Sequence, residues 1–349
     1  MSVTRVETPK PQKPWRPTPR ALVPTFLGIL ATLIGTWTLI RFTGIAGKLG
    51  AFSAAVLLTT LISASIAGWQ RGKQAAKNAA VGSLITAGAL VAVFPVISIL
   101  GTVLVRGVRG IYVGFFTNDM GLASVNDPLN VGGIKHAILG TFLMILIATL
   151  ISVPLGVSTA IYLTEIKGPG TRLIRFLVQA MSGVPSIVAG LFIYSAVIAG
   201  TGRGFNGLFG AFALAILMLP TVARTAEEVL LLIAQDLREA GLALGATQWR
   251  TVAMVVVPAA KSGLITAVIL GVARIAGETA PLLFTTGGGD VTNLNPVNGV
   301  MGSIPFAIWK ALISGSEESN ARAWASILVL LVLVMTLFFT ARRLGKVRR

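Results

Sequence analysis

The chain has 349 residues, of which 54% are hydrophobic and only 12% are charged, against about 25% charged residues in an ordinary soluble domain. It carries a net charge of +17 and no cysteine, which excludes disulfides, a thiolate nucleophile and a cysteine-ligated metal site. This composition is typical of a protein that crosses a membrane many times.

Seven runs of 19 to 29 residues contain no Asp, Glu, Lys or Arg. A transmembrane helix needs roughly 20 apolar residues, whereas barrel strands are shorter and alternate in polarity. An eighth run, which begins at Ser262, qualifies except for Arg274 and Glu278. We therefore predict an all-α polytopic membrane protein. Its eight expected spans are 21–40, 50–69, 79–104, 136–163, 175–199, 207–223, 262–284 and 323–341.

The basic residues predict the orientation of these spans. With the N-terminus in the cytoplasm, 20 Lys and Arg residues fall on the inner side and 8 on the outer side, which is the bias of the positive-inside rule. Both termini are then cytoplasmic basic tails, 1–20 and 342–349. This distribution explains the charge by topology and by anionic lipid, and not by nucleic acid.

The chain divides by composition into a peripheral part and a core. Residues 21–78 form an additional hairpin of two spans with a charged link, and residues 79–341 contain the six remaining spans. His136, the only histidine, begins a span, and we expect it at the membrane interface. Asp119 and Asp127 lie in an outer loop, where they either meet a protein partner or are solvated.

Residues 224–260 form one long cytoplasmic insertion. A short helix is expected from Arg238, with Glu239 in its first turn, where the helix dipole favours an anion. Gly245 allows a turn that larger residues resist. Thr247 is a candidate N-cap for a second helix, which Pro258 is expected to stop. The insertion therefore predicts a protruding helix–turn–helix, which we call the knob.

The spacing in the knob resembles the EAA loop of ABC-importer permeases. That loop reads Glu-Ala-Ala, three residues, Gly, nine residues, then aliphatic, any residue, aliphatic and Pro. The matching residues here are Glu239, Ala240, Gly241, Gly245, Val255, Val257 and Pro258. The sequence departs once, with Gly241 in place of the usual Ala. The resemblance implies an element that docks in a cleft of a cytoplasmic ATPase, whereas the alternative is an ordinary amphipathic loop.

The chain has no phosphate-binding loop of its own. Its Gly-Lys pairs are never followed by Ser or Thr, as the Walker A motif requires. We therefore expect no cofactor in this chain, and we expect ATP and Mg²⁺ to be bound by a partner ATPase.

The span 262–284 places charge inside the membrane. At about 100° per residue, Gly263, Ala267 and Gly271 share one narrow helical face with Arg274 and Glu278. Small residues mark a helix contact or a lining wall, and a charge at mid-membrane costs about 2.5–3.5 kcal/mol even on lenient scales. Two interpretations stay open: a structural salt bridge between residues four apart, or the lining of an anion path.

Arg224 ends another span, at residue 223, with Glu227 and Glu228 one turn further on. It is either an anchor that extends to the membrane surface or a charge at the inner mouth of a path.

Several stretches together resemble a narrower family, the A-type permease subunits of phosphate-specific ABC importers. They are GTFLMILIATLISVPLGVSTAIYLTE (140–165), GVPSIVAGLF (183–192), ALAILMLPTVARTAEE (213–228), ARIAGETAPLLFT (273–285) and GSIPFAIW (302–309). The similarity covers about residues 79–341 and leaves out the first two spans. It implies that Arg224, Arg274 and Glu278 lie on the substrate path.

The resemblance also implies a fold, a function and partners. The fold is a type I ABC-importer permease core of six spans, and the function is import of inorganic phosphate across the cytoplasmic membrane, without enzymatic activity in this chain. The partners are a C-type phosphate permease subunit, two ATPase subunits and an extracytoplasmic phosphate-binding protein. Alternatives are an importer of another oxyanion or small solute, and an ion-coupled secondary transporter. A membrane-embedded enzyme is hard to assemble without cysteine and with one histidine.

Overall fold

The computed structural model describes residues 19–43 and 48–345. The predicted basic tails lie outside this range, except for residues 19–20 of the first and 342–345 of the second. Within the described residues the regular structure is helical, and the β contribution is one isolated bridge between Gly287 and Met301.

By its packing the chain divides into two compact units, with the boundary between Leu100 and Gly101. The helices of the first unit are α1 (Pro19–Thr43), α2 (Lys48–Arg71) and most of α3 (Lys73–Arg109). Gly72, at φ 85°, makes the turn between α2 and α3. Because α3 begins at Lys73, the charged link expected up to residue 78 is largely helical. The boundary between the units lies inside α3 because Gly107, near its end, packs closely on Leu328 of the second unit.

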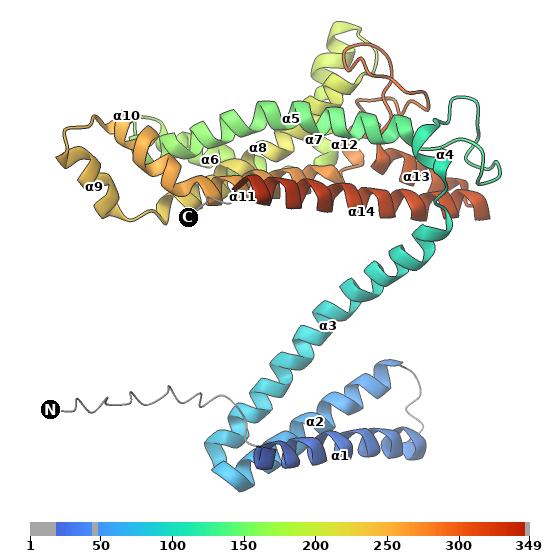
Figure 1. Cartoon of the computed structure of the whole chain (residues 1–349), viewed down its shortest axis with the longest axis vertical. Coiled ribbons are helices and arrows are strands. Elements are labelled where there is room, and N and C mark those ends of the chain that lie inside the picture. Colours follow the sequence, from blue (N-terminus) through green and yellow to red (C-terminus); the bar gives the residue numbers. More distant parts are fainter. Residues whose placement is uncertain (1–18, 44–47, 346–349) are drawn as a thin grey trace, which may run out of the picture. The chain divides into compact units, whose positions relative to one another are not determined.

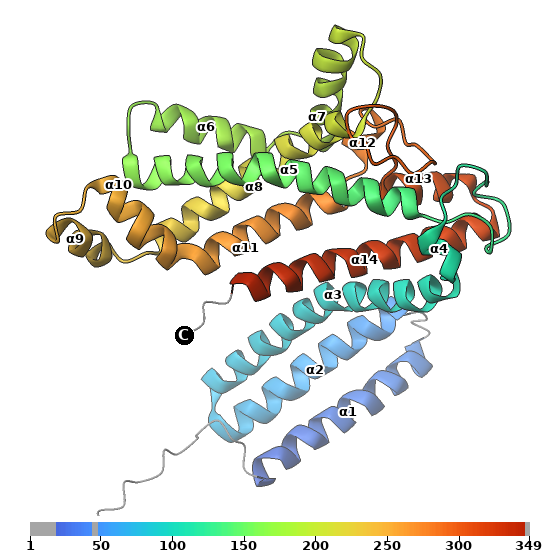
Figure 2. The same cartoon turned by 45° about the horizontal axis from the view of Figure 1, so that its top comes forward.

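The second unit contains the remaining helices. They are α4 (Val113–Thr117), α5 (Lys135–Ile161), η1 (Tyr162–Ile166), α6 (Thr171–Ser182), α7 (Ser186–Ile193), η2 (Tyr194–Ala199), α8 (Gly207–Leu231), α9 (Gln235–Ala243), α10 (Gln248–Thr251), η3 (Val252–Val256), α11 (Val257–Ala276), α12 (Ala280–Leu283), α13 (Ile304–Ser314) and α14 (Glu317–Gly345), where η denotes a π-helical turn. In Figures 1 and 2, α9 and α10 lie at one end of this unit and α4 and α13 at the opposite end. We call residues 232–256 the α9 end, and residues 110–136 and 285–322 the α13 end.

Six helices among the described residues are long and apolar enough to cross a membrane. They are Gly50–Arg71, Lys73–Arg109, Lys135–Ile166, Gly207–Leu231, Gln248–Ala276 and Glu317–Arg343. A bent pair, Thr171–Ser182 with Ser186–Ala199, is a seventh candidate, and Phe26–Leu39 and Ile304–Ser314 are shorter apolar helices. The predicted all-α membrane architecture is confirmed, whereas the count of eight spans and the side of each terminus stay predictions.

Two predicted spans are broken in the structure. The run 175–199 bends by 103° between α6 and α7, because Pro185 lacks an N–H and disfavours helical geometry at the preceding residue. The run 262–284 ends its long helix at Ala276, and a short break precedes α12. Pro281 explains this break in the same way, since it has no N–H to bond to the carbonyl of Gly277.

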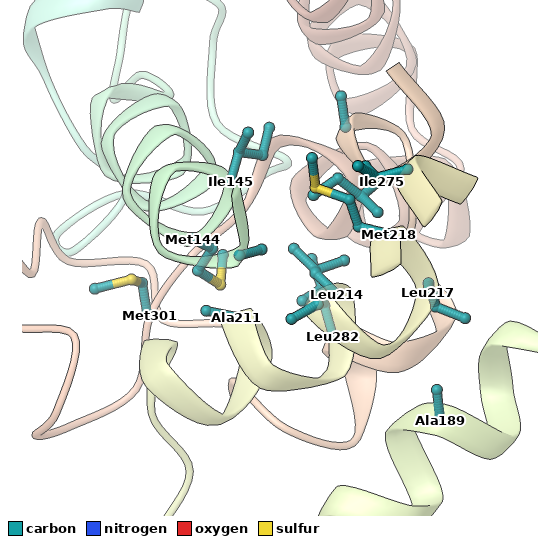
Figure 3. Close-up of a cluster of buried hydrophobic side chains, with 14 residues drawn as sticks. Met144, Ile145, Ala189, Ala211, Leu214, Leu217, Met218, Ile275, Leu282 and Met301 are labelled. Carbon is teal, nitrogen blue, oxygen red and sulfur yellow. The ribbon is translucent and has the colours of Figure 1, made fainter. Parts of the chain in front are cut away.

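The core of the second unit lies where α5, α7, α8, α11 and α12 meet. Its buried side chains include Met144, Ile145, Leu214, Met218, Ile275 and Leu282 (Figure 3). Glycines bring the helices together: a Cβ on Gly156 of α5 would lie 2.9 Å from the Val222 side chain of α8, and a Cβ on Gly271 of α11 would lie 2.7 Å from it. Close packing of this kind holds helices in membranes, where lipid offers apolar side chains the same surroundings as protein.

Candidate functional site

The knob protrudes at the α9 end between two long helices. Helix α8 ends at Leu231 and α9 begins at Gln235, three residues before the predicted start. The acid in the first turn of α9 is therefore Asp236, and Glu239 lies exposed in the middle of the helix. The prediction that Glu239 occupies the first turn is wrong, because the chain leaves α8 earlier than its apolar pattern indicates.

Gly245 makes the turn after α9. Its φ is +81°, a value that other L-residues adopt only at a cost of about 1–2 kcal/mol. The Ala246 N–H donates to the Gly241 carbonyl at 3.2 Å, and the Gly245 N–H donates to the Leu242 carbonyl at 2.9 Å. This pair of bonds is a Schellman motif, which satisfies the last carbonyls of a helix. The turn expected at Gly245 is present.

The second helix of the knob differs from the prediction at its far end. The Thr247 hydroxyl accepts from the Arg250 N–H, so the predicted N-cap is confirmed. Pro258 does not stop the helix, since Gln248–Ala276 forms one helix of 29 residues. The π-helical turn η3 precedes Pro258, which lies in the first turn of α11, where a missing N–H costs little.

The single departure from the EAA pattern has a steric partner. Gly241 is buried, and a Cβ on it would lie 2.8 Å from Cγ2 and 3.0 Å from Oγ1 of Thr251. Thr251 is 3% exposed. The Thr251 side chain therefore occupies the space that the methyl group of an alanine at position 241 would take. Gly241 and Thr251 fit together across the turn.

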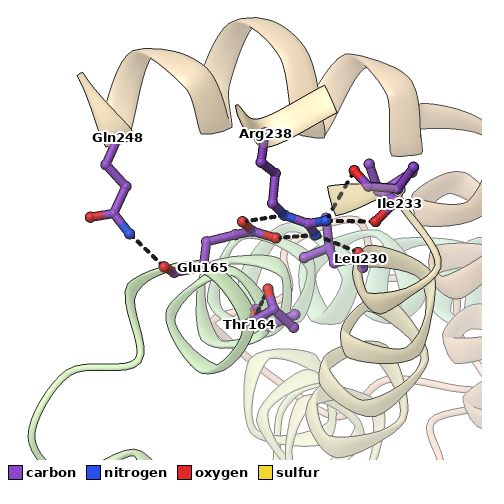
Figure 4. A network of polar contacts seen from close by, with 8 residues as sticks. Thr164, Glu165, Leu230, Ile233, Arg238 and Gln248 are labelled. Atoms are coloured by element: carbon purple, nitrogen blue, oxygen red, sulfur yellow. Dashed lines mark hydrogen bonds and ion pairs between the residues drawn. The ribbon is translucent and has the colours of Figure 1, made fainter. Parts of the chain in front are cut away.

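A partly buried ion pair attaches the knob to the rest of the unit (Figure 4). Arg238 of α9 donates to both carboxylate oxygens of Glu165 in η1, with Nε–Oε2 2.9 Å and Nη2–Oε1 2.7 Å. The side chains are 16% and 6% exposed. Arg238 also donates to the carbonyls of Leu230 and Ile233, at the end of α8. Hydrogen bonding to Glu165 raises the pKa of Arg238, so the guanidinium stays charged.

Gln248 adds a second attachment to the same place, because its Nε2 donates to the Glu165 carbonyl at 2.6 Å. Glu165, Arg238 and Gln248 all line a cavity of about 500 Å³ beneath the knob. Sequence reasoning missed this network. Glu165 and Arg238 are 73 positions apart, and neither lies within an uncharged run.

The α9 end exposes large apolar side chains among its polar ones. Four large side chains are strongly exposed: Leu232 (84%), Leu244 (90%), Trp249 (64%) and Met254 (76%). Side chains of this kind, gathered on a protruding element, mark a surface for a protein partner. Glu239 and Ala240 are exposed on the same element.

Arg274 and Glu278 lie close together but not on one helix. Arg274 is in the last turn of α11, and Glu278 follows Gly277 in the break before α12. Their Nη1–Oε1 distance is 3.7 Å, and the side chains are 48% and 15% exposed. Gly271 on the predicted shared face packs on α8, so Arg274 lies at the edge of this contact and points away from the core.

Arg224 lies elsewhere, beside a second ion pair. It lines a cavity of about 220 Å³ together with Gln179, Glu228 and the pair formed by Arg175 and Glu227 at 2.7 Å. Neither Arg274 nor Glu278 lines this cavity. Arg224 is exposed and makes no ion pair or hydrogen bond with the residues that the structure describes. The three predicted path residues therefore form two separate groups.

The α13 end is closed by polar contacts between its loops. The Asp119 carboxylate accepts from the Thr292 N–H and hydroxyl, each at 2.9 Å, and Asp127 accepts from the Ser124 N–H at 2.8 Å. Asp119 therefore joins two loops instead of only facing solvent. His136 is 3% exposed, so its side chain is packed within the protein, and its expected depth at the membrane interface stays a prediction.

Comparison with known proteins agrees with these features. The family model described as "Binding-protein-dependent transport system inner membrane component" matches residues 152–348. The phosphate transport system permease protein PstA 1 of Mycobacterium tuberculosis (strain H37Rv) is 36% identical over 267 residues, which cover 76% of this chain and 86% of that protein. PstA of Haemophilus influenzae is 39% identical over 245 residues, which cover 69% and 84%.

A solved structure gives the same fold. A structure of the MetNI methionine ABC transporter in an inward-facing conformation aligns with 61% of this chain and 93% of its own matched chain, with a TM-score of 0.50 and 19% identity. The core thus has the fold of that ABC-transporter chain. Together, the family match, the relatives and the apolar helices show that this multi-pass protein of the cytoplasmic membrane belongs to the binding-protein-dependent inner membrane component family, among the PstA permeases.

Proposed function

We propose that this chain is the permease subunit of an ATP-driven importer that moves inorganic phosphate across the cytoplasmic membrane. The observation that carries the proposal is the match over about three-quarters of the chain to relatives named as phosphate transport permeases. The knob at the α9 end supports it independently, because a secondary transporter has no use for an exposed apolar docking element.

The proposed mechanism begins at the knob. A cytoplasmic ATPase subunit, which binds ATP and Mg²⁺, receives the exposed apolar side chains around Leu244 and Trp249 in a cleft. Arg238 joins the knob to Glu165 in η1, which continues α5, and to the Leu230 carbonyl at the end of α8. Displacement of the knob on ATPase closure is therefore transmitted to the two helices that form the centre of the core.

The proposed substrate path uses the exposed charges. Arg274 is 48% exposed in a helix that crosses the membrane, and a guanidinium facing lipid costs at least about 2.5 kcal/mol. Its exposed side therefore faces water or a second permease subunit. Glu278 balances the arginine, so that a passing oxyanion is attracted without being trapped, and Arg224 offers a second contact at the inner mouth.

The complete importer in this proposal contains a C-type permease subunit, two ATPase subunits and an extracytoplasmic phosphate-binding protein. The α9 end and both termini face the cytoplasm, and the α13 end faces the binding protein. The expected positive-inside bias supports this orientation.

The test is uptake of radiolabelled phosphate into proteoliposomes that contain the complex and the binding protein, with ATPase activity recorded in parallel. We expect uptake only with ATP, and a loss of at least ten-fold in Arg274→Gln while ATP hydrolysis and assembly persist. Arg172→Gln, which changes an exposed arginine of α6, is the matched control and should transport normally.

Three other outcomes would each contradict one part of the proposal. Normal transport by Arg274→Gln makes the Arg274–Glu278 pair structural. Uptake of a different oxyanion but not phosphate removes the substrate assignment. Uptake that resists vanadate but collapses with the ion gradient identifies a secondary transporter.

A further inference from the structure

A small cavity lies at the α13 end, apart from the residues discussed above as a substrate path. Its volume is about 30 Å³. Five segments meet at its walls: the α4 region, the start of α5, the loop before α13, α13 and α14. The polar side chains among its lining residues are His136, Asp290, Lys310, Arg322 and Ser326. The sequence pattern gave no sign of this group, because its members are far apart in the chain.

Arg322 is the central observation. The residue is 4% exposed, and its Nη2 donates to the carbonyls of Asp127 at 2.9 Å and Pro128 at 2.7 Å. Its Nε and Nη1 are buried and have no hydrogen-bond partner among the described residues. A buried guanidinium whose Nε and Nη1 have no acceptor within the chain is strongly unfavourable unless a bound species accepts from them.

The other charged groups at this cavity do not neutralise the charge of Arg322. Lys310 forms an ion pair with Asp290, so these two charges match each other. His136 is 3% exposed, and its Nδ1 is also buried without a partner in the part of the chain that the structure describes. One positive charge and three unpartnered nitrogens, Nε and Nη1 of Arg322 and Nδ1 of His136, therefore belong to residues that line one cavity.

We propose that this cavity is a binding site for a single halide ion, chloride under ordinary conditions. The ion accepts from Nε and Nη1 of Arg322 and from the Nδ1–H of His136, and it neutralises the guanidinium, which a water molecule cannot do. A cavity of this volume holds at least one particle the size of a water molecule, and a halide ion is of that order of size. The bound ion links the five segments and so stabilises the α13 end, a role separate from transport.

The first test measures thermal unfolding of the full chain in detergent. Sodium chloride is compared with sodium gluconate at constant ionic strength. We expect a saturable rise of about 2 °C in the unfolding midpoint with chloride, and its loss in Arg322→Gln. Arg106→Gln is the matched control, because Arg106 lies over the Trp324 ring at 5.3 Å and does not line the cavity. A chloride shift that Arg322→Gln retains would overturn the proposal.

The second test needs no variant, so it holds even if Arg322→Gln does not fold. Crystals of the wild-type protein grown in bromide should show an anomalous difference peak in the cavity, beside the guanidinium of Arg322. A peak there supports the halide site. Density without an anomalous signal identifies a water molecule and refutes the proposal.

Discussion

The two ends of the second unit hold their loops in opposite ways. At the α9 end, Arg238 and Gln248 both attach the knob through Glu165, and large apolar side chains such as Leu244 remain exposed. At the α13 end, hydrogen bonds from Thr292 to Asp119 join the loops, and charged groups such as Arg322 are buried.

The α9 end therefore has the features of a surface that binds a protein partner, whereas the loops of the α13 end bind to each other. A protruding apolar surface gains its stabilisation only when another protein covers it, so the α9 end requires a stiff internal attachment that survives docking. The α13 end joins its loops by hydrogen bonds within the chain. We therefore expect single substitutions to act more strongly on the α9 end, where the polar attachments meet at Glu165 and Arg238.

The largest expected effect is that of Arg238→Met. Removing one partner leaves the Glu165 carboxylate buried at 6% exposure, which costs about 3 kcal/mol. The carbonyl of Leu230 loses its donor as well. We expect a lower unfolding midpoint and, in the assembled importer, ATP hydrolysis that no longer drives uptake. Thermal unfolding and parallel uptake and ATPase assays measure both.

The matched control is the ion pair between Arg175 and Glu227, which has the same 2.7 Å distance but an arginine that is 54% exposed. Arg175→Met should cost at most about 1 kcal/mol, because an exposed pair is screened by solvent. Equal losses from the two substitutions would show that burial does not distinguish the pairs, and the contrast between the ends would fail.

The next effect in size concerns the turn of the knob. Gly245→Ala places a Cβ on a residue at φ +81° and should cost about 1–2 kcal/mol. A Cβ there meets no atom within 4 Å, so the cost is conformational and not steric. Gly245→Asn should recover part of the loss, since asparagine tolerates this region better. Faster hydrogen exchange confined to residues 235–247 is the expected readout, and exchange unchanged in both variants would contradict it.

The sequence predicts the knob better than it predicts its attachment. Gly245 and Thr247 act through the backbone of their own turn, so local spacing is enough to identify them. Arg238 and Glu165 come together only when α5 and α8 pack, and their 73-residue separation leaves no local pattern. Of the three predicted path residues, Arg274 and Glu278 are neighbours in the chain and do pair, whereas Arg224 lies apart.

Hydropathy likewise predicts helices but not their interruptions. Apart from Arg175, the run 175–199 is uncharged, so hydropathy predicts one span, and it does not register the bend of 103° at Pro185. At Pro258 the opposite happens: a proline expected to end a helix is accommodated by the π-helical turn before it. Proline removes one hydrogen bond in both places, and tertiary packing decides whether the helix bends or continues.

A smaller effect tests the fit between the two helices of the knob. Gly241→Ala restores the usual EAA residue and adds about 1 kcal/mol of helix propensity, but its methyl would lie 2.8 Å from Thr251. We expect a net loss below about 1 kcal/mol, since overpacking offsets the propensity. The double variant Gly241→Ala/Thr251→Ala should be at least as stable as the wild type. If Gly241→Ala alone stabilises the protein, Thr251 is not the constraint.

The smallest effect concerns Asp119 and depends on pH. Hydrogen bonds from Thr292 lower the pKa of this carboxyl from its usual value of 3.8. A lowered folded-state pKa means that the stabilisation is complete above the usual value and disappears as the pH falls through the folded-state pKa. Asp119→Asn should therefore speed hydrogen exchange around residue 292 at pH 7, by an amount equivalent to less than about 1 kcal/mol.

The ratio of exchange rates between Asp119→Asn and the wild type should approach one once the pH lies well below 3.8, because the wild-type carboxyl is then protonated and also neutral. Residues 235–247, at the α9 end, serve as the internal reference, since Asp119 has no contact there. A ratio that stays constant from pH 7 to low pH would mean that the charge of Asp119 contributes nothing. In that case the charge of Asp119 does not stabilise the contact between the α13-end loops. The two ends would then differ in whether charge contributes to their contacts, and not only in burial.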